Sequence, residues 1–169
     1  MRYKTLILII LLSIPAAAPA QSSYIGYKYK GVLPSKRLPN GVVHNGGGLI
    51  GDVEAATVHG ISQVKRGTTD MLWFESSTGK NASGVTGWKV LDVLSFPRKA
   101  KADYIFIYGD PSVSCNRNGS DIPNLVGVGR VISRSQGIFK PSKLWVANLE
   151  SKKFEPIKIA GVKCEHGEP

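Results

Sequence analysis

Apolar side chains recur at every second position in several short runs of the chain, which is the spacing of a β-strand with one buried face. Residues 88–96 place four apolar side chains on one face, and only Asp92 interrupts them. At helical spacing Trp88 would share its face with Asp92 and Ser95, so the pattern favours a long strand. Because burying a lone carboxylate is costly, we expect Asp92 to pair with a lysine or arginine or to lie at a bulge.

The clearest strand signals lie near the C-terminal end. Residues 144–149 are largely apolar on both faces, which predicts a central strand, and residues 154–159 carry the chain back as a second strand. The charged segment 150–153 between them has the composition of a turn, so the two strands form a predicted hairpin. Pro156 cannot donate a backbone hydrogen bond to a neighbouring strand, and it is therefore expected at an edge or a bulge.

Three further runs favour strands. Residues 58–65 and 71–74 flank turn-forming residues at 66–70, which predicts a second hairpin. Residues 103–108 give the strongest signal for a central strand, because both of their faces are apolar and rich in strand-forming residues.

Glycine marks three other segments. Residues 46–51 formally fit GxGxxG, but that motif needs a buried strand before it and a full helix after it, so we interpret them as a turning loop and not as a dinucleotide site. Residues 109–123 are predicted to form one long loop. In the strand predicted at 124–132, Gly127 and Gly129 leave little side chain on one face, so a neighbouring segment is expected to pack closely there.

These runs amount to about eight or nine short strands without a convincing helix. The predicted fold is all-β, a single-domain, mostly antiparallel sandwich or barrel with one disulfide. The predicted core contains apolar residues from most of the runs: Leu72, Phe74, Val90, Leu94, Tyr104, Phe106, Val126, Val146 and Ile157, with Trp73, Trp88 and Trp145 at least partly buried.

The first twenty residues have the pattern of a signal peptide. Arg2 and Lys4 precede a short apolar run, and small residues lead to a predicted cleavage before Gln21. The apolar run is much shorter than the roughly 20 residues of a membrane-spanning helix. We therefore predict an exported protein, periplasmic or extracellular, without a transmembrane span. Its predicted parts are a signal peptide at 1–20, an N-terminal strand and linker at 21–41, an all-β domain at 42–165 and a tail at 166–169.

Charge narrows the choice of partner. The chain carries a formal charge of +10, and removal of Arg2 and Lys4 with the leader reduces it to +8. A basic exported protein is attracted to anionic polymers. Nucleic acid is the least favoured of these here. The alternative is that the positive charge only keeps the protein soluble. The predicted partner is an anionic polymer or an envelope protein. The candidate contacts are basic residues and interleaved tyrosines: Tyr27, Lys28, Tyr29, Lys30, Arg98, Lys99 and Lys101.

Two cysteines, Cys115 and Cys164, are the only ones in the chain. In an exported protein such a pair favours a disulfide over a metal or redox site. The bridge would close a loop of about 50 residues and contribute about 4 kcal/mol by restricting the unfolded chain. It would tie the C-terminal strand to the segment 109–123.

Catalytic and metal-binding signals are weak. The chain lacks GxSxG and SxxK motifs, and the spacings of its ligand-type residues match neither a zinc site nor an EF-hand. We predict no cofactor, no metal and no catalytic residue. Two alternatives to a non-enzymatic binding protein stay open: a secreted hydrolase that uses carboxylates near Asp92 or in 109–123, and an accessory subunit of an envelope assembly, which would expose an apolar patch.

One resemblance concerns the run GWKVLDVLSFP, the later segment that contains Cys115, and the ending FEPIKIAGVKCE. Over most of residues 40–165 these motifs are similar to small, uncharacterised secreted proteins of bacteria. The resemblance implies a bacterial envelope location and carries no activity to transfer.

Overall fold

The computed structural model describes residues 22–31, 38–96 and 103–167. These residues form two antiparallel β-sheets, and their one helical element is a short 3₁₀-helix, η1 (Ser22–Tyr24). The all-β fold with antiparallel sheets is thus confirmed. The predicted signal peptide lies outside the described residues. Within the described ranges no helix is long and apolar enough to cross a membrane.

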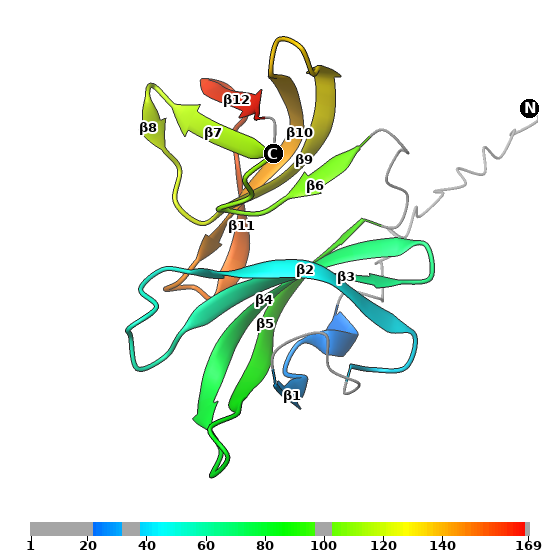
Figure 1. Cartoon of the computed structure of the whole chain (residues 1–169), viewed down its shortest axis with the longest axis vertical. Helices are drawn as coiled ribbons and strands as arrows, with labels where there is room; N and C mark the ends of the chain where they lie inside the picture. The colour runs from blue at the N-terminus through cyan, green and yellow to red at the C-terminus, as the bar shows by residue number, and fades with distance from the viewer. Residues whose placement is uncertain (1–21, 32–37, 97–102, 168–169) are drawn as a thin grey trace, which may run out of the picture.

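The first sheet, called sheet A, has five strands and forms the lower half of Figure 1. In spatial order its strands are β1 (Lys28–Lys30), β5 (Thr86–Phe96), β4 (Thr69–Lys80), β3 (His59–Arg66) and β2 (Val42–Ile50). Consecutive strands from β2 to β5 are joined as hairpins, so most of its contacts are between neighbours in the sequence.

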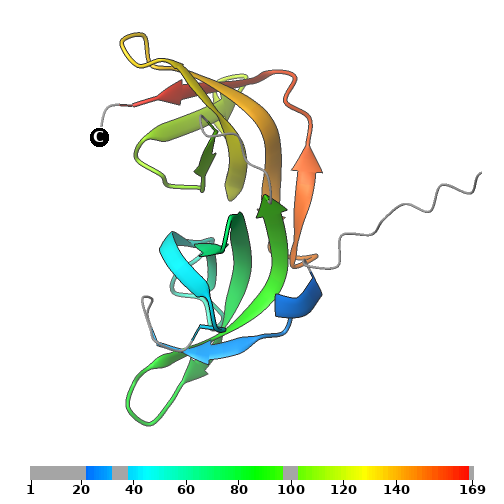
Figure 2. The same ribbon diagram turned by 90° about the vertical axis from the view of Figure 1, so that its right-hand side faces the viewer.

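The second sheet, sheet B, lies above the first in both views (Figures 1 and 2). In spatial order its strands are β6 (Tyr104–Phe106), β9 (Leu125–Ser133), β10 (Ile138–Asn148), β12 (Val162–His166), β7 (Val113–Arg117) and β8 (Ser120–Asp121), and β11 (Lys153–Ile157) pairs with β10.

An apolar cluster between the two sheets, called the shared core, holds them together. From sheet A it takes side chains such as Leu72 and Phe74, which are fully buried. From sheet B it takes Val126 and Phe154, and the rings of Phe74 and Phe154 have centroids 5.6 Å apart. Burying aromatic and aliphatic side chains in this way is the main stabilising contribution to such a fold.

The predicted C-terminal hairpin is confirmed. β10 pairs with β9, β11 and β12, as expected for a central strand. β11 pairs with β10 alone among the described strands, so Pro156 lies in an edge strand. A residue without a backbone N–H group is tolerated there because a second neighbouring strand does not need that donor.

Asp92 lies beside a bulge, which is one of the two expected arrangements. Phe74 pairs with Asp92, but Glu75 pairs with Val90, so Leu91 is the extra residue of β5. The Asp92 carboxylate accepts a hydrogen bond of 2.8 Å from the backbone N–H of Phe154. It therefore satisfies a main-chain donor of sheet B instead of a lysine or arginine side chain.

Three predictions of local structure were wrong. Residues 46–51 do not turn as a loop, because Gly46 to Ile50 continue β2 and pair with β3. The segment 103–108 gives only the short edge strand β6, since it pairs with β9 alone. The segment 109–123 contains β7 and β8, which form a hairpin through Asn118 and Gly119. Their φ angles of 54° and 82° are those of a two-residue hairpin turn, for which Asn-Gly is the favoured sequence.

The predicted core is mostly correct. Five of its members are buried: Leu72, Phe74, Val90, Phe106 and Val126. Three others, Leu94, Val146 and Ile157, pack partly buried against the clusters, as do Trp88 and Trp145, whereas Trp73 is fully buried. Tyr104 is the error: its ring is 38% exposed because β6 is an edge strand.

The glycines of β9 allow the expected close packing. A Cβ atom on Gly127 would lie 2.7 Å from the Phe106 ring and from the Leu144 side chain, and one on Gly129 would lie 2.5 Å from the backbone oxygen of Lys140. Aromatic rings thus rest directly on the main chain of this strand.

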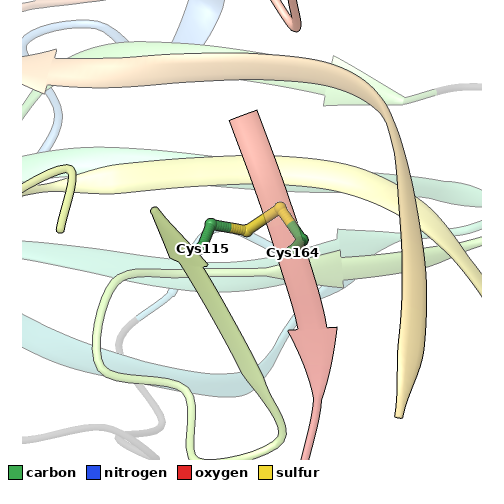
Figure 3. Close-up of a disulfide and its surroundings, with 2 residues drawn as sticks. All are labelled: Cys115 and Cys164. Atoms are coloured by element: carbon green, nitrogen blue, oxygen red, sulfur yellow. A yellow bond between two sulfur atoms is a disulfide. The ribbon is translucent and has the colours of Figure 1, made fainter. Parts of the chain in front are cut away.

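The predicted disulfide joins Cys115 of β7 to Cys164 of β12 (Figure 3). The two residues are directly opposite each other in the ladder between these strands, and both are buried. The bridge fixes the C-terminal strand to the β7–β8 hairpin, and both cysteines belong to the apolar cluster that contains Phe106 and Phe139.

Replacing both cysteines by serine is expected to lower the free energy of unfolding by about 2–4 kcal/mol, because the unfolded chain regains the freedom of a long loop. Guanidinium unfolding monitored by tryptophan fluorescence measures the loss, and reduction of the wild-type protein should reproduce it. Equal unfolding midpoints for the double variant and the oxidised wild type would contradict the expectation.

Candidate functional site

Strand β1 presents different chemistry on its two faces. Tyr29 is 6% exposed and turns inward, whereas Lys28 and Lys30 on either side of it are exposed. The strand pairs with β5, where Trp88 is opposite Tyr29 and Lys89 is opposite Lys28. Because side chains alternate along a strand, this edge of sheet A carries an aromatic face and a basic face.

The aromatic face belongs to a cavity of about 420 Å³ on the side of sheet A turned away from sheet B, called the Glu75 cavity. Residues from all five strands, or next to them, line it: Tyr29, Gly31, His44, Gly47, Gly48, Leu49, Gly60, Ile61, Ser62, Glu75, Thr86 and Trp88. Its size is within the range of small-molecule sites.

A buried carboxyl group forms the polar centre of this cavity. Glu75 of β4 is 2% exposed. The Tyr29 hydroxyl lies 2.9 Å from each of its carboxylate oxygens, and the Ser62 hydroxyl donates a hydrogen bond of 2.7 Å to Oε2. Three strands, β1, β3 and β4, therefore supply the three polar side chains of one small network.

Burial controls the ionisation of this network. Removal from water raises the pKa of Glu75 to about 7, although the hydrogen bonds from Ser62 and Tyr29 oppose the shift. Burial, followed by the nearby charge of Glu75, also raises the pKa of the Tyr29 hydroxyl. The carboxyl group thus titrates near neutral pH, whereas the tyrosine stays a hydrogen-bond donor.

Glycines keep the space above this network open. Gly47 of β2 pairs with Ser62, and Gly60 of β3 pairs with Glu75, so both glycines face the cavity. A Cβ atom on Gly60 would lie 3.6 Å from the Trp88 ring, inside the space that the cavity occupies. Leu49 and Trp88 form apolar walls, and Leu49 is 52% exposed at the rim.

His44 also lines the cavity. Burial lowers its pKa, which a hydrogen bond with the Gly46 backbone partly opposes. The imidazole is therefore neutral at pH 7, and among the described lining residues the carboxyl group of Glu75 is the one that can carry a formal charge at that pH.

The basic face carries a row of side chains that we call the lysine row: Lys28, Lys30 and Lys89, all exposed. Lys28 is directly opposite Lys89, a like-charge pair that destabilises a sheet. Across the next two strands, Lys89 is opposite Ser76 and Ser76 is opposite His59, so the row contains no carboxylate.

A fourth lysine lies near the end of this row. Burial and then the positive charge of Lys152 lower the pKa of His59, so the β10–β11 turn brings a cation close to it. A comparable like-charge pair in sheet B, Lys140 opposite Arg130, differs because Arg130 forms an ion pair of 2.6 Å with Asp103.

The candidate polyanion contacts fall into three groups. Lys28 and Lys30 are exposed on the basic face. Tyr27 and Tyr29 belong to the aromatic face, where they pack with Trp73 in a buried cluster, so they do not interleave with the lysines on one surface. The remaining candidates, Arg98, Lys99 and Lys101, lie outside the described residues.

The carboxylates considered for hydrolysis lie outside the Glu75 cavity and the lysine row. The Asp92 carboxylate accepts a hydrogen bond from the Phe154 backbone N–H. Asp110 and Asp121 line a separate cavity of about 290 Å³ beside the disulfide, where Asp110 accepts hydrogen bonds from the Tyr104 hydroxyl and the Ser112 backbone. Among the described residues, no three His, Cys, Asp or Glu side chains are grouped so that they could hold a metal ion.

Glu75 and Ser62 were missed by sequence reasoning, although a signal was present. In MLWFE the residues Met71, Trp73 and Glu75 share a face at a spacing of two, so a charge follows two buried apolar side chains. Such a residue must be paired or satisfied by hydrogen bonds when it is buried. Its partners come from distant strands, and only the fold brings them together.

Family models, curated proteins and solved structures gave no match to this chain. The inference of function therefore rests on the geometry of sheet A.

Replacing Glu75 by glutamine is expected to remove a pH dependence of stability. The folded-state pKa of about 7 exceeds the ordinary value of 4.5. The free energy of unfolding therefore falls as pH rises from about 4.5 to 7 and stays at the lower value above pH 7. That loss amounts to about 3 kcal/mol. Urea unfolding of Glu75→Gln and wild type at pH 4.5 and pH 8 measures it.

The exposed Glu150→Gln is the matched control, since its side chain is not buried. A stability difference between Glu75→Gln and wild type that is the same at both pH values would show that Glu75 ionises as an ordinary carboxyl group.

Proposed function

We propose that the protein is an exported, non-enzymatic binding protein that holds an anionic polymer along the lysine row. The observation that carries the proposal is the direct cross-strand pairing of Lys28 with Lys89, two exposed like charges without a carboxylate in their row. An arrangement that costs stability is explained if phosphate, sulfate or carboxylate groups of a ligand lie across it.

The geometry of the row fits a repeating polymer better than a single anion. Lys28 and Lys30 are two residues apart on β1 and point the same way, at a spacing of roughly 7 Å along the strand. Lys89 stands beside Lys28 on the neighbouring strand, and Lys152 lies farther along, near His59. The export and the net positive charge that the sequence predicts support an anionic envelope polymer as the ligand of this surface.

Two alternative proposals each have one supporting observation. For a secreted hydrolase, the supporting observation is the pair Asp110 and Asp121 in one cavity. For an accessory subunit, it is the exposed apolar side chains of Leu49 and Val53, which border neighbouring cavities. Neither of these two observations includes a pair of like charges directly opposite each other, as the lysine row does.

The test compares two triple variants with the same loss of charge. Lys28→Gln, Lys30→Gln and Lys89→Gln remove the lysine row, whereas the control variant changes three exposed lysines of sheet B: Lys140, Lys143 and Lys163. Binding to inorganic polyphosphate and to heparin is measured by fluorescence titration over a range of salt concentrations.

We expect the variant without the lysine row to bind at least about tenfold more weakly at low salt. The slope of a plot of log K against log salt concentration should become shallower by roughly one unit for each lysine removed. The control variant should stay close to wild type. Equal losses in both variants would mean that net charge alone attracts the polymer, and wild-type binding that ignores salt would also contradict the proposal.

A further inference from the structure

We propose that the Glu75 cavity is a second binding site, which takes a ligand that carries an ammonium group on a small apolar or aromatic body. The site is independent of the lysine row, because Tyr29 and Trp88 point to the opposite side of β1 and β5 from Lys28 and Lys89.

The carboxyl group is the first argument. Glu75 is 2% exposed and lines the cavity, and among the described residues its carboxylate accepts side-chain hydrogen bonds from Tyr29 and Ser62 alone. Among the described residues that line the cavity there is no lysine or arginine. A buried carboxylate without a cation is costly, and a positively charged ligand is the partner that would balance it.

The other charged and titratable groups around the cavity do not replace that partner. Tyr29 keeps its proton, and His44 is neutral at pH 7 because burial lowers its pKa. Lys80 lies in the adjoining cavity and not in this one. An anionic ligand would face Glu75 without a compensating charge, so the charge of the site selects against it.

The walls are the second argument. Trp88 and Tyr29 both line the cavity, and aromatic rings attract an ammonium group through their π-electrons. Leu49, on the same side of sheet A as Glu75, is aliphatic and suits the body of the ligand. A polar ligand that lacks an apolar body would leave these walls unused.

The space is the third argument. A neighbouring cavity of about 310 Å³ shares Leu49, Thr86 and Trp88 with the first, and its lining includes the apolar side chains of Val53 and Val58. Trp88 thus lines both cavities, whereas Glu75 lines the first and not the second. A ligand with an ammonium group at one end and an apolar tail fits this distribution.

Three probes of matched shape test the proposal on the secreted protein: 2-phenylethylammonium, 2-phenylethanol and 3-phenylpropanoate. Isothermal titration calorimetry at pH 8 and pH 5 measures their affinities for wild type, for Glu75→Gln and for the exposed control Glu150→Gln. Unfolding curves and amide NMR spectra establish that each variant is folded.

At pH 8 we expect the ammonium probe to bind at least about tenfold more tightly than the alcohol, and the carboxylate probe more weakly than either. Glu75→Gln should bring the ammonium probe and the alcohol to equal affinity, and Glu150→Gln should change neither. At pH 5, where Glu75 is protonated, the wild type should lose most of its preference for the ammonium probe.

If the ammonium probe and the alcohol bind wild type equally at pH 8, or if the ammonium probe fails to bind at millimolar concentration, the proposal is overturned. The pH comparison keeps the test decisive even if Glu75→Gln does not fold, since a preference that persists unchanged at pH 5 would exclude Glu75 as its cause.

Discussion

The packing of sheet A on sheet B around Phe74 and Phe154 is the constraint on which the other features depend. Phe74 is fully buried between the sheets, and strand alternation then sends its neighbours Trp73 and Glu75 to the opposite side of sheet A. That side must be covered in turn, and Tyr29 of β1, together with Tyr24 and Tyr27 before this strand, covers it only in part. The Glu75 cavity is the space that this incomplete cover leaves.

Much of the fold follows from local patterns in the sequence. The strands around Trp73, Val90 and Val146 and the hairpin that contains Pro156 are confirmed, because alternation and turn composition act over a few residues. The disulfide is confirmed, and the sequence could predict its partners because two cysteines allow one pairing within the chain. The errors have a different origin: edge position exposes Tyr104, and Gly46 to Gly48 form a strand only because β3 pairs beside them.

The candidate site was predictable only in part. Lys28 and Lys30 could be proposed as polyanion contacts from composition, but Lys89, the partner of Lys28, is 89 − 28 = 61 residues away and is identified by strand pairing alone. Glu75, Tyr29 and Ser62 likewise meet through three different strands. Long-range pairing thus gives sheet A two faces of different chemistry on the same strands. One face carries the lysine row, and the other carries aromatic side chains around the Glu75 carboxyl group.

The proposal that the lysine row is the polymer site is tested most directly by a two-dimensional ¹H–¹⁵N NMR titration with short inorganic polyphosphate. The predicted result is that the amide signals of Lys28, Lys30 and Lys89 move first and farthest, followed by those of Ser76 and His59 in the same row. Shifts of equal size at Lys140, Lys143 and Lys163 of sheet B would contradict it, because the polymer would then follow net charge and not this arrangement of strands.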